Sequence, residues 1–407
     1  MLDIFHEEFG DIPQIGASVD GMIFPEDIRT DGVALVLCRD DDARIHIEGL
    51  KSKGSIKTAE KLASRIKCEN GAVILHFPLV HVPGALKSAE FYAKGFFYSN
   101  KCKNNNPLKQ KEYAGKFSDY CNRENIFYLP PTILEIFAKQ LNHKIPIIGI
   151  NVMHTQVRFD TPHIFCNFED IGAGIAALVI EKKDVNVVYD DIFPDKGKTI
   201  DETMDIVRKE FKVVKEFKAV FEKNILIQLD DNPPIKAVKD LISVNKEKED
   251  ELIKNISNGN FKVQMPYILL FFNKRTYGKI HTGIGGYYPF DLYPFFIDVS
   301  DCDERVFLAY ELIGGKFDGF ISSLKKAKLK EKFRFFTLDI STTQVFGNRV
   351  YAFGNEVKNA AKTNYFGVMT CAPSIYLPKH FQNRNCLPEA DKNIFYTPAG
   401  SNICLEI

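Results

Sequence analysis

The chain has 407 residues, a formal net charge of zero from 53 basic and 53 acidic side chains, and nine cysteines. Charge neutrality argues against general nucleic-acid binding and against attraction to anionic membranes, because both interactions need a surplus of positive charge. A chain of this length can bury a sizeable core and usually divides into about two domains.

The sequence also indicates a reducing, intracellular environment. The cysteines are scattered without a CxxC pair and their number is odd, which is typical of reduced thiols rather than of a disulfide framework. The first residues, MLDIFHEEFGD, lack the basic flank and the apolar stretch of a signal peptide. No uninterrupted apolar run approaches the roughly 20 residues that span a bilayer. We therefore expect a soluble, cytoplasmic protein with neither a membrane nor a nucleic-acid partner.

The first half of the chain alternates between predicted helices and strands. Apolar spacing predicts a helix over residues 1–10. Two apolar runs, 33–38 and 43–47, flank Asp40–Asp42 and predict a β-hairpin. Periodicity then predicts a helix at 55–66, a buried strand at 71–80 and a helix at 132–141. The Lys/Asn-rich stretch at about 95–125 has the composition of a long polar surface insertion.

A change of composition at 194–212 marks a predicted domain boundary. There, Pro, Gly and charged residues lead into a Lys/Glu-rich helix. We place one domain at 1–210 and a second at 211–407. The second is predicted to contain strands at 223–229, 266–273, 294–299, 305–313, 333–340 and 402–407, and helices at 235–243, 246–256 and 317–330.

A short phrase containing Ile-Gly occurs twice. It reads DIPQIGAS at Asp11–Ser18 and KIPIIGIN at Lys144–Asn151, each time after a helix-like segment and before a glycine-led pair of strands. A looser echo is YFGVMT at Tyr365–Thr370. Repeated units with glycine at the same point suggest duplicated modules. We therefore predict an α/β protein (mixed α+β) of two related domains, built from repeated strand–helix–strand units, with mixed sheets covered by helices.

The three phrases also carry the predicted ligand site. A strand that ends in glycine lets the backbone turn sharply and lets another group approach closely. Small polar side chains just after it stand at the carboxyl end of the strand, where ligands settle in open α/β sheets. The alternative is that the glycines only allow tight packing of strand against loop. The predicted ligand-binding residues are Gly16, Ser18, Asp20, Gly149, Asn151, His154, Gly367 and Thr370.

Motifs for other chemistry are weak or absent in the sequence. Gly283–Tyr288 (GIGGYY) has neither GxGxxG nor GK[ST] spacing, so it does not indicate a nucleotide site. His76 and His81 lie on opposite faces of a predicted strand, and without an HExxH or Cys/His cluster a structural zinc site is not indicated. Ser18 lies in G-x-S-x-x-G rather than GxSxG, and Cys371 is interpreted as a small buried residue.

The order of these elements resembles the paired FIST domains (F-box and intracellular signal transduction), in a stand-alone form. The likeness covers residues 11–190 and roughly 215–378. It consists of Pro-x-x-Gly-x-Ser-x-x-Gly, a hairpin led by Asp-Gly, a second Ile-Gly phrase, an asparagine-bearing strand, and a strand–turn–helix with Asn-Pro-Pro. At Asp339–Thr343 and at 367–373 the sequence departs from the family, which tends to have Ser-Cys-x-Gly-Arg and Gly-Phe-x-Thr-x-Gly-Glu there. Ala372 and Pro373 stand where the family tends to have the Gly-Glu pair, so this chain lacks that glutamate.

What the resemblance implies is sensing rather than turnover. FIST modules are described as binding small molecules such as amino acids and signalling to output domains, so we expect an intracellular small-molecule sensor that acts through a separate signalling protein. Three alternatives stay open. They are a haem-based gas sensor with His154 or another histidine as ligand, an enzyme with Cys371 or Ser18 as nucleophile and His154 as base, and a scaffold without a ligand. The sequence also leaves open the cofactor and the oligomeric state, a homodimer included.

Overall fold

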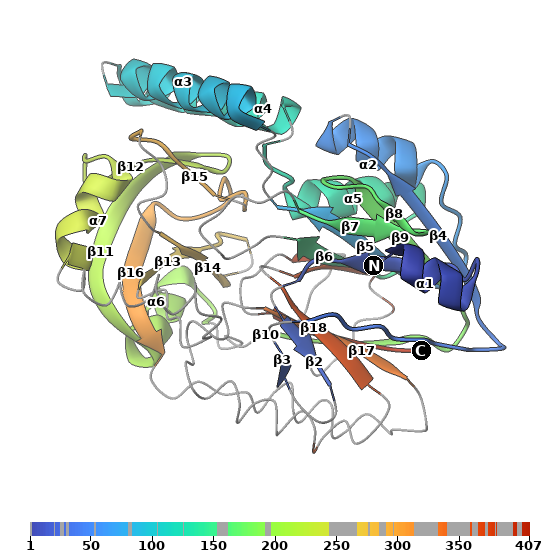
Figure 1. Cartoon of the computed structure of the whole chain (residues 1–407). Coiled ribbons are helices and arrows are strands. Elements are labelled where there is room, and N and C mark those ends of the chain that lie inside the picture. The colour runs from blue at the N-terminus through green and yellow to red at the C-terminus, as the bar shows by residue number, and fades with distance from the viewer. Residues whose placement is uncertain are drawn as a thin grey trace.

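The computed structural model describes the chain in segments, and its elements lie within them. The described residues are 2–19, 21–24, 28–29, 32–52, 54–79, 84–103, 105–124, 126–152, 162–191, 197–243, 267–275, 277–284, 290–295, 297–312, 333–339, 359, 365–370, 373–378, 380, 394–396 and 401–407. Within these segments the chain forms seven helices and four sheets (Figure 1), so the predicted mixed α/β class is confirmed. None of these helices is long and apolar enough to cross a membrane.

A six-stranded sheet, here called the central sheet, has two parallel strands in its middle. Its order is β20-β19-β6-β5-β9-β4, with β5 and β6 parallel and the other neighbours antiparallel. The strands are β4 (Arg44–Leu50), β5 (Gly71–Pro78), β6 (Ile147–Val152), β9 (Ile175–Glu181), β19 (Ser374–Leu377) and β20 (Ile394–Tyr396). Every residue of β5 is buried, because both faces of the sheet are covered.

Two helices cover one face of the central sheet. They are α2 (Ser55–Ala63) and α5 (Pro130–Gln140). Val73 and Phe77 of β5 pack in one buried cluster with Leu62 of α2 and Phe137 of α5. Both helices supply an apolar stripe at helical spacing, which is why the sequence pattern located them correctly.

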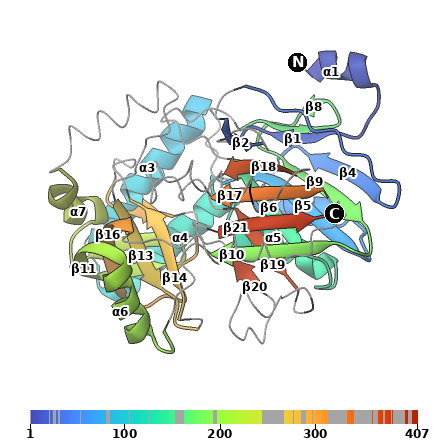
Figure 2. The same ribbon diagram turned by 90° about the horizontal axis from the view of Figure 1, so that it is seen from below.

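A second six-stranded sheet, here called the facing sheet, covers the other face. Its order is β10-β21-β17-β18-β2-β3. Its strands are β2 (Gly21–Ile23), β3 (Ile28–Arg29), β10 (Asn186–Asp191), β17 (Arg334–Asp339), β18 (Tyr365–Thr370) and β21 (Ser401–Glu406). Figure 2 shows this sheet lying over the central one, and Ile74 of the central sheet packs in one cluster with Ile403 and Leu405. The two sheets therefore bury a shared apolar layer between them.

Strands from both halves of the chain share these two sheets. β10 pairs with β21, β2 pairs with β18, and β6 pairs with β19. The predicted boundary at 210/211 therefore divides strands that are hydrogen-bonded to one another. As a boundary between independent domains, it stays a prediction.

A third sheet of six strands is antiparallel throughout and belongs to the second half. Its order is β14-β13-β16-β11-β12-β15. The strands are β11 (Phe211–Glu222), β12 (Ile225–Leu229), β13 (Tyr267–Phe272), β14 (Lys279–Gly283), β15 (Tyr293–Pro294) and β16 (Arg305–Leu312), and the helices beside them are α6 (Ile200–Glu210) and α7 (Pro234–Ser243). The helices predicted at 246–256 and 317–330 lie outside the described residues.

The stretch at 95–125 is not the polar surface insertion that its composition predicts. It forms most of two packed helices, α3 (Gly84–Lys103) and α4 (Pro107–Arg123), which lie against the antiparallel sheet (Figure 1). Phe117 is fully buried in a cluster with Ile225 of β12 and Phe290. The hydroxyl of Ser118 donates a 2.6 Å hydrogen bond to the side chain of Asn224. Lysines and asparagines lie between the buried aromatic side chains, so the apolar stripes of α3 and α4 are not apparent from the composition of this stretch.

The predicted hairpin at 33–47 is also wrong in its first arm. Residues 43–47 lead into β4, which pairs with β9, whereas 33–40 form no strand. Upstream lie α1 (Leu2–Phe9) and β1 (Ile15–Ala17). β1 pairs with β7 (Ile164–Cys166), which pairs with β8 (Glu169–Asp170), and the three strands form a small sheet. The first Ile-Gly phrase thus enters an antiparallel edge strand and the second enters a central parallel strand. The two phrases occupy unlike positions in the fold.

Candidate functional site

The second and third phrases meet between the central and facing sheets. Asn151 lies near the carboxyl end of β6 and Thr370 is the last residue of β18. Both residues are fully buried, and the hydroxyl of Thr370 donates a hydrogen bond to the backbone carbonyl of Asn151. Two of the predicted site residues, far apart in the sequence, are therefore in direct contact.

The glycines of these two phrases allow close packing between neighbouring strands. Gly149 lies inside β6, opposite Ser374 of β19, and a Cβ atom at Gly149 would come within 2.1 Å of the Ser374 hydroxyl. A Cβ at Gly367 would come within 2.9 Å of the Phe336 side chain. Neither glycine ends its strand, since β6 and β18 continue for three residues beyond them. The close approach that the sequence predicted is present, but the neighbours are other strands.

The first phrase reaches the same region through a histidine that the sequence pattern did not select. His76 lies on β5 beside Ile150 of β6, and it forms a hydrogen bond with the backbone of Gly16. Alternation along β5 places His76 on the same face as Ile74, toward the facing sheet. His76 therefore lies where the first and second phrases come together. The sequence signal for it was its place near the carboxyl end of a fully buried strand.

The imidazole of His76 is buried and incompletely hydrogen-bonded. The residue is 7% exposed, and its Nδ1 atom has no hydrogen-bond partner among the described residues. Burial lowers the pKa of His76 to about 4, although the hydrogen bond to the Gly16 backbone opposes this shift in part. His76 is therefore neutral near pH 7. A buried polar atom without a partner is uncommon in native proteins and is a reason to consider a ligand.

Ser18 lies at the edge of this region and is held by backbone groups. Its hydroxyl accepts a 3.2 Å hydrogen bond from the backbone N–H of His163, and its own N–H donates to the His163 carbonyl at 2.8 Å. The His163 ring instead contacts the carboxylate of Asp170 at 2.7 Å. The three residue types of a catalytic triad are present, but the described contacts do not join the serine hydroxyl to the imidazole.

Several candidates cannot be placed. Asp20, His154 and Cys371 lie outside the described residues. Among the described residues, no three His, Cys, Asp or Glu side chains are grouped so that they could hold a metal ion.

Two described thiols are deeply buried, and burial raises the pKa of both Cys121 and Cys404 well above its usual value. Neither is suited to act as a nucleophile at neutral pH.

Comparison with known proteins adds a relationship in the second half. Residues 201–314 match the AF0772-like protein C-terminal domain. The matched segment runs from α6 to the end of β16 and includes the antiparallel sheet. A curated relative from Archaeoglobus fulgidus, itself an uncharacterized protein, is 26% identical over 278 residues, which are 68% of this chain and 73% of the relative.

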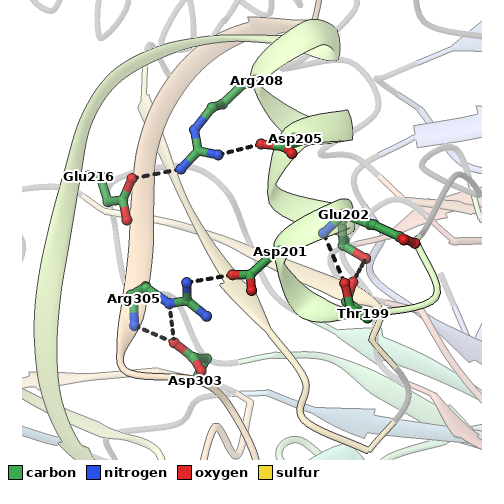
Figure 3. Close-up of polar contacts among 9 residues, drawn as sticks. Thr199, Asp201, Glu202, Asp205, Arg208, Glu216, Asp303 and Arg305 are labelled. Atoms are coloured by element: carbon green, nitrogen blue, oxygen red, sulfur yellow. Dashed lines mark hydrogen bonds and ion pairs between the residues drawn. The ribbon is translucent and has the colours of Figure 1, made fainter.

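None of the eight predicted site residues lies in the segment that matches the AF0772-like domain. In that segment, helix α6 packs against the antiparallel sheet (Figure 3). Met204 and Val207 of α6 are buried against Phe307 of β16. Around them, ion pairs join Arg208 to Asp205 (2.7 Å) and Glu216 (2.9 Å), and Arg305 to Asp201 (2.6 Å) and Asp303 (2.9 Å). Exposed pairs of this kind stabilise little, so the helix is held mainly by its apolar face.

Proposed function

We propose that this protein binds a small molecule between its central and facing sheets, beside His76. The observation that carries the proposal is the unpartnered Nδ1 of a histidine that is more than nine-tenths buried. It lies beside residues from both Ile-Gly phrases, and the looser echo at Tyr365–Thr370 contacts the second phrase through Thr370. A ligand that supplies the missing hydrogen bond would relieve the cost of this buried polar atom.

The surroundings of His76 restrict the chemistry of the ligand. Its cross-strand neighbour Ile150 and Ile74, two residues earlier on the same face of β5, are aliphatic, and the ring is neutral near pH 7 because burial lowers its pKa. A neutral imidazole nitrogen in an apolar layer favours a single uncharged hydrogen-bonding group over a charged one. The ligand class is therefore a compact molecule with an apolar body and one polar group directed at His76.

The regulatory part of the proposal rests on the resemblance to paired FIST domains. That resemblance supports a sensor whose bound state is recognised by a separate signalling protein. An enzymatic role with Cys371 or Ser18 as nucleophile stays an alternative, since Cys371 and His154 lie outside the described residues.

Thermal unfolding tests the binding proposal. The full chain would be heated alone, with each of a panel of small uncharged compounds that have an apolar body and one hydrogen-bonding group (phenol, indole and benzyl alcohol), and separately with haem. The midpoint of unfolding would be compared with that of His76→Asn. A ligand of the site raises the wild-type midpoint and leaves that of His76→Asn unchanged, because mass action stabilises only a folded state that binds. A compound that stabilises both proteins equally would place binding elsewhere. An absorption band near the haem Soret region that depends on His76 would favour the haem alternative.

A further inference from the structure

Among the described residues, no further strand pairs with one edge of the central sheet. The sheet ends at β4, whose pairing among the described residues is with β9 alone. The strand has seven residues without proline, and Ile45 on it is 42% exposed. An unpaired edge presents a row of backbone N–H and C=O groups that can accept another strand. Charged side chains normally discourage such pairing, so the charges on β4 decide which strand can dock.

The polar side chains of β4 are complementary to those of a second β4 strand that runs antiparallel to it. If two copies pair antiparallel about Ile47, His46 of one copy lies opposite Glu48 of the other, twice by symmetry. Within one chain, His46 Nε2 lies 3.4 Å from Glu48 Oε1, so both side chains stand on the same face of the strand. An imidazole and a carboxylate opposite each other can form a cross-strand hydrogen bond, whereas two like charges opposite each other destabilise the pair.

Exposed aliphatic side chains lie just before this edge in the sequence. Val33 and Leu37 are 63% and 60% exposed, and no backbone hydrogen bond ties 33–39 to a strand among the described residues. The hairpin that the sequence predicted would have covered the β4 edge with these residues, but the chain does not form it. Exposed apolar side chains of this size are common features of interaction surfaces.

We propose that the β4 edge is the interface of a homodimer, in which two β4 strands pair antiparallel about Ile47 and join two central sheets into one. We assign the partner strand to a second copy of this chain, because antiparallel pairing of two β4 strands places His46 of each copy opposite Glu48 of the other. The interface is independent of the ligand site, since β9 separates β4 from the strand that carries His76.

Sedimentation velocity of the full chain over a range of concentrations tests the dimer. The wild type is expected to sediment as a dimer at high concentration. His46→Glu places two glutamates opposite each other at two symmetric positions and should weaken dimerisation by about tenfold. The charge swap His46→Glu/Glu48→His restores the complementary pair and should recover most of that loss. Ile45→Lys should also weaken the dimer, whereas Leu86→Lys, at an exposed position of α3, should not.

Circular dichroism on each variant checks that it is folded, so loss of the dimer can be separated from loss of structure. A wild type that is monomeric at every concentration would overturn the proposal. So would a dimer that His46→Glu and Ile45→Lys leave intact, because its interface would then lie elsewhere. If the charge-swap variant His46→Glu/Glu48→His is folded but dimerises no more tightly than His46→Glu, the register about Ile47 is contradicted.

Discussion

The hydroxyl of Thr370 donates a hydrogen bond to the backbone carbonyl of Asn151, 219 residues earlier in the chain. Both residues are fully buried, and they join the carboxyl-terminal part of a central strand to the end of a strand in the facing sheet. This contact links the two sheets at the place where we propose a ligand binds. It also offers a direct test of how the halves of the chain are held together.

Thr370→Val should lower the free energy of unfolding by about 1–3 kcal/mol, because it leaves a buried carbonyl without this donor. Thr337→Val is the matched control. Thr337 is also fully buried, on the neighbouring strand, but its hydroxyl has no partner among the described residues, so valine there should be neutral or stabilising. Urea unfolding of both variants provides the measurement. Equal losses in the two variants would show that the Thr370 contact does not stabilise the fold.

His76 should make the folded state sensitive to acid. Its pKa is about 4 in the folded protein and 6.5 in an ordinary environment, so below pH 6.5 the unfolded chain gains a proton that the folded chain does not. Stability should therefore fall as the pH drops from 6.5 toward 4, by up to about 3 kcal/mol from this group alone.

Urea unfolding at pH 7 and pH 5 measures this effect. His76→Gln should lose the part of the pH dependence that belongs to His76, whereas His6→Gln, at an exposed position on α1, should retain it. If wild type and His76→Gln lose the same stability between the two pH values, the histidine titrates normally and is not buried as described.

Gly149→Ala should destabilise the central sheet by about 1–3 kcal/mol, because its Cβ would overlap the hydroxyl of Ser374 and approach Phe77. Adding Ser374→Gly should restore part of the loss, since it removes the nearest atom. Gly115→Ala in α4 is the control. The Glu222 side chain would lie 3.5 Å from a Cβ there, an ordinary contact, so alanine should be neutral or stabilise the helix by up to about 1 kcal/mol. Thermal denaturation that ranked these glycines in the opposite order would contradict the strand spacing.

The α3–α4 pair should be essential to the core. Phe117→Ala should cost about 3–5 kcal/mol, because the ring is fully buried against Phe290 and β12. Leu108→Ala on the same helix should change stability by less than about 0.5 kcal/mol, since that side chain is 81% exposed. A surface insertion, as the composition predicted, would instead give two small and similar changes.

The sequence predicted elements whose stabilising pattern is local. The apolar run of β5 and the helical stripe of α2 are visible within a dozen residues, and both were placed correctly. The α3–α4 pair was missed because its buried aromatic residues face a sheet that lies a hundred residues further along. The 33–38 run was predicted as a strand because it is apolar, but a strand also needs a partner edge, which local pattern does not reveal.

Part of the candidate site was predictable, because the repeated phrases are local patterns in the sequence. The Ile-Gly phrases pointed to the region where Thr370 meets Asn151, but the phrases themselves were assumed to be equivalent, and they are not. His76 was passed over because no motif surrounds it. Its significance comes from the pairing of β5 with β6 and from the approach of the Gly16 backbone, which are contacts of the folded chain.

Native mass spectrometry of the purified full chain, beside His76→Asn and the control His6→Asn at an exposed position on α1, tests the proposed site most directly. The account predicts a small molecule bound at one per chain in the wild type and in His6→Asn, and its absence from folded His76→Asn. A molecule retained equally by all three proteins, or a wild type that gains no bound mass after exposure to a cell metabolite extract, would contradict a ligand site at His76.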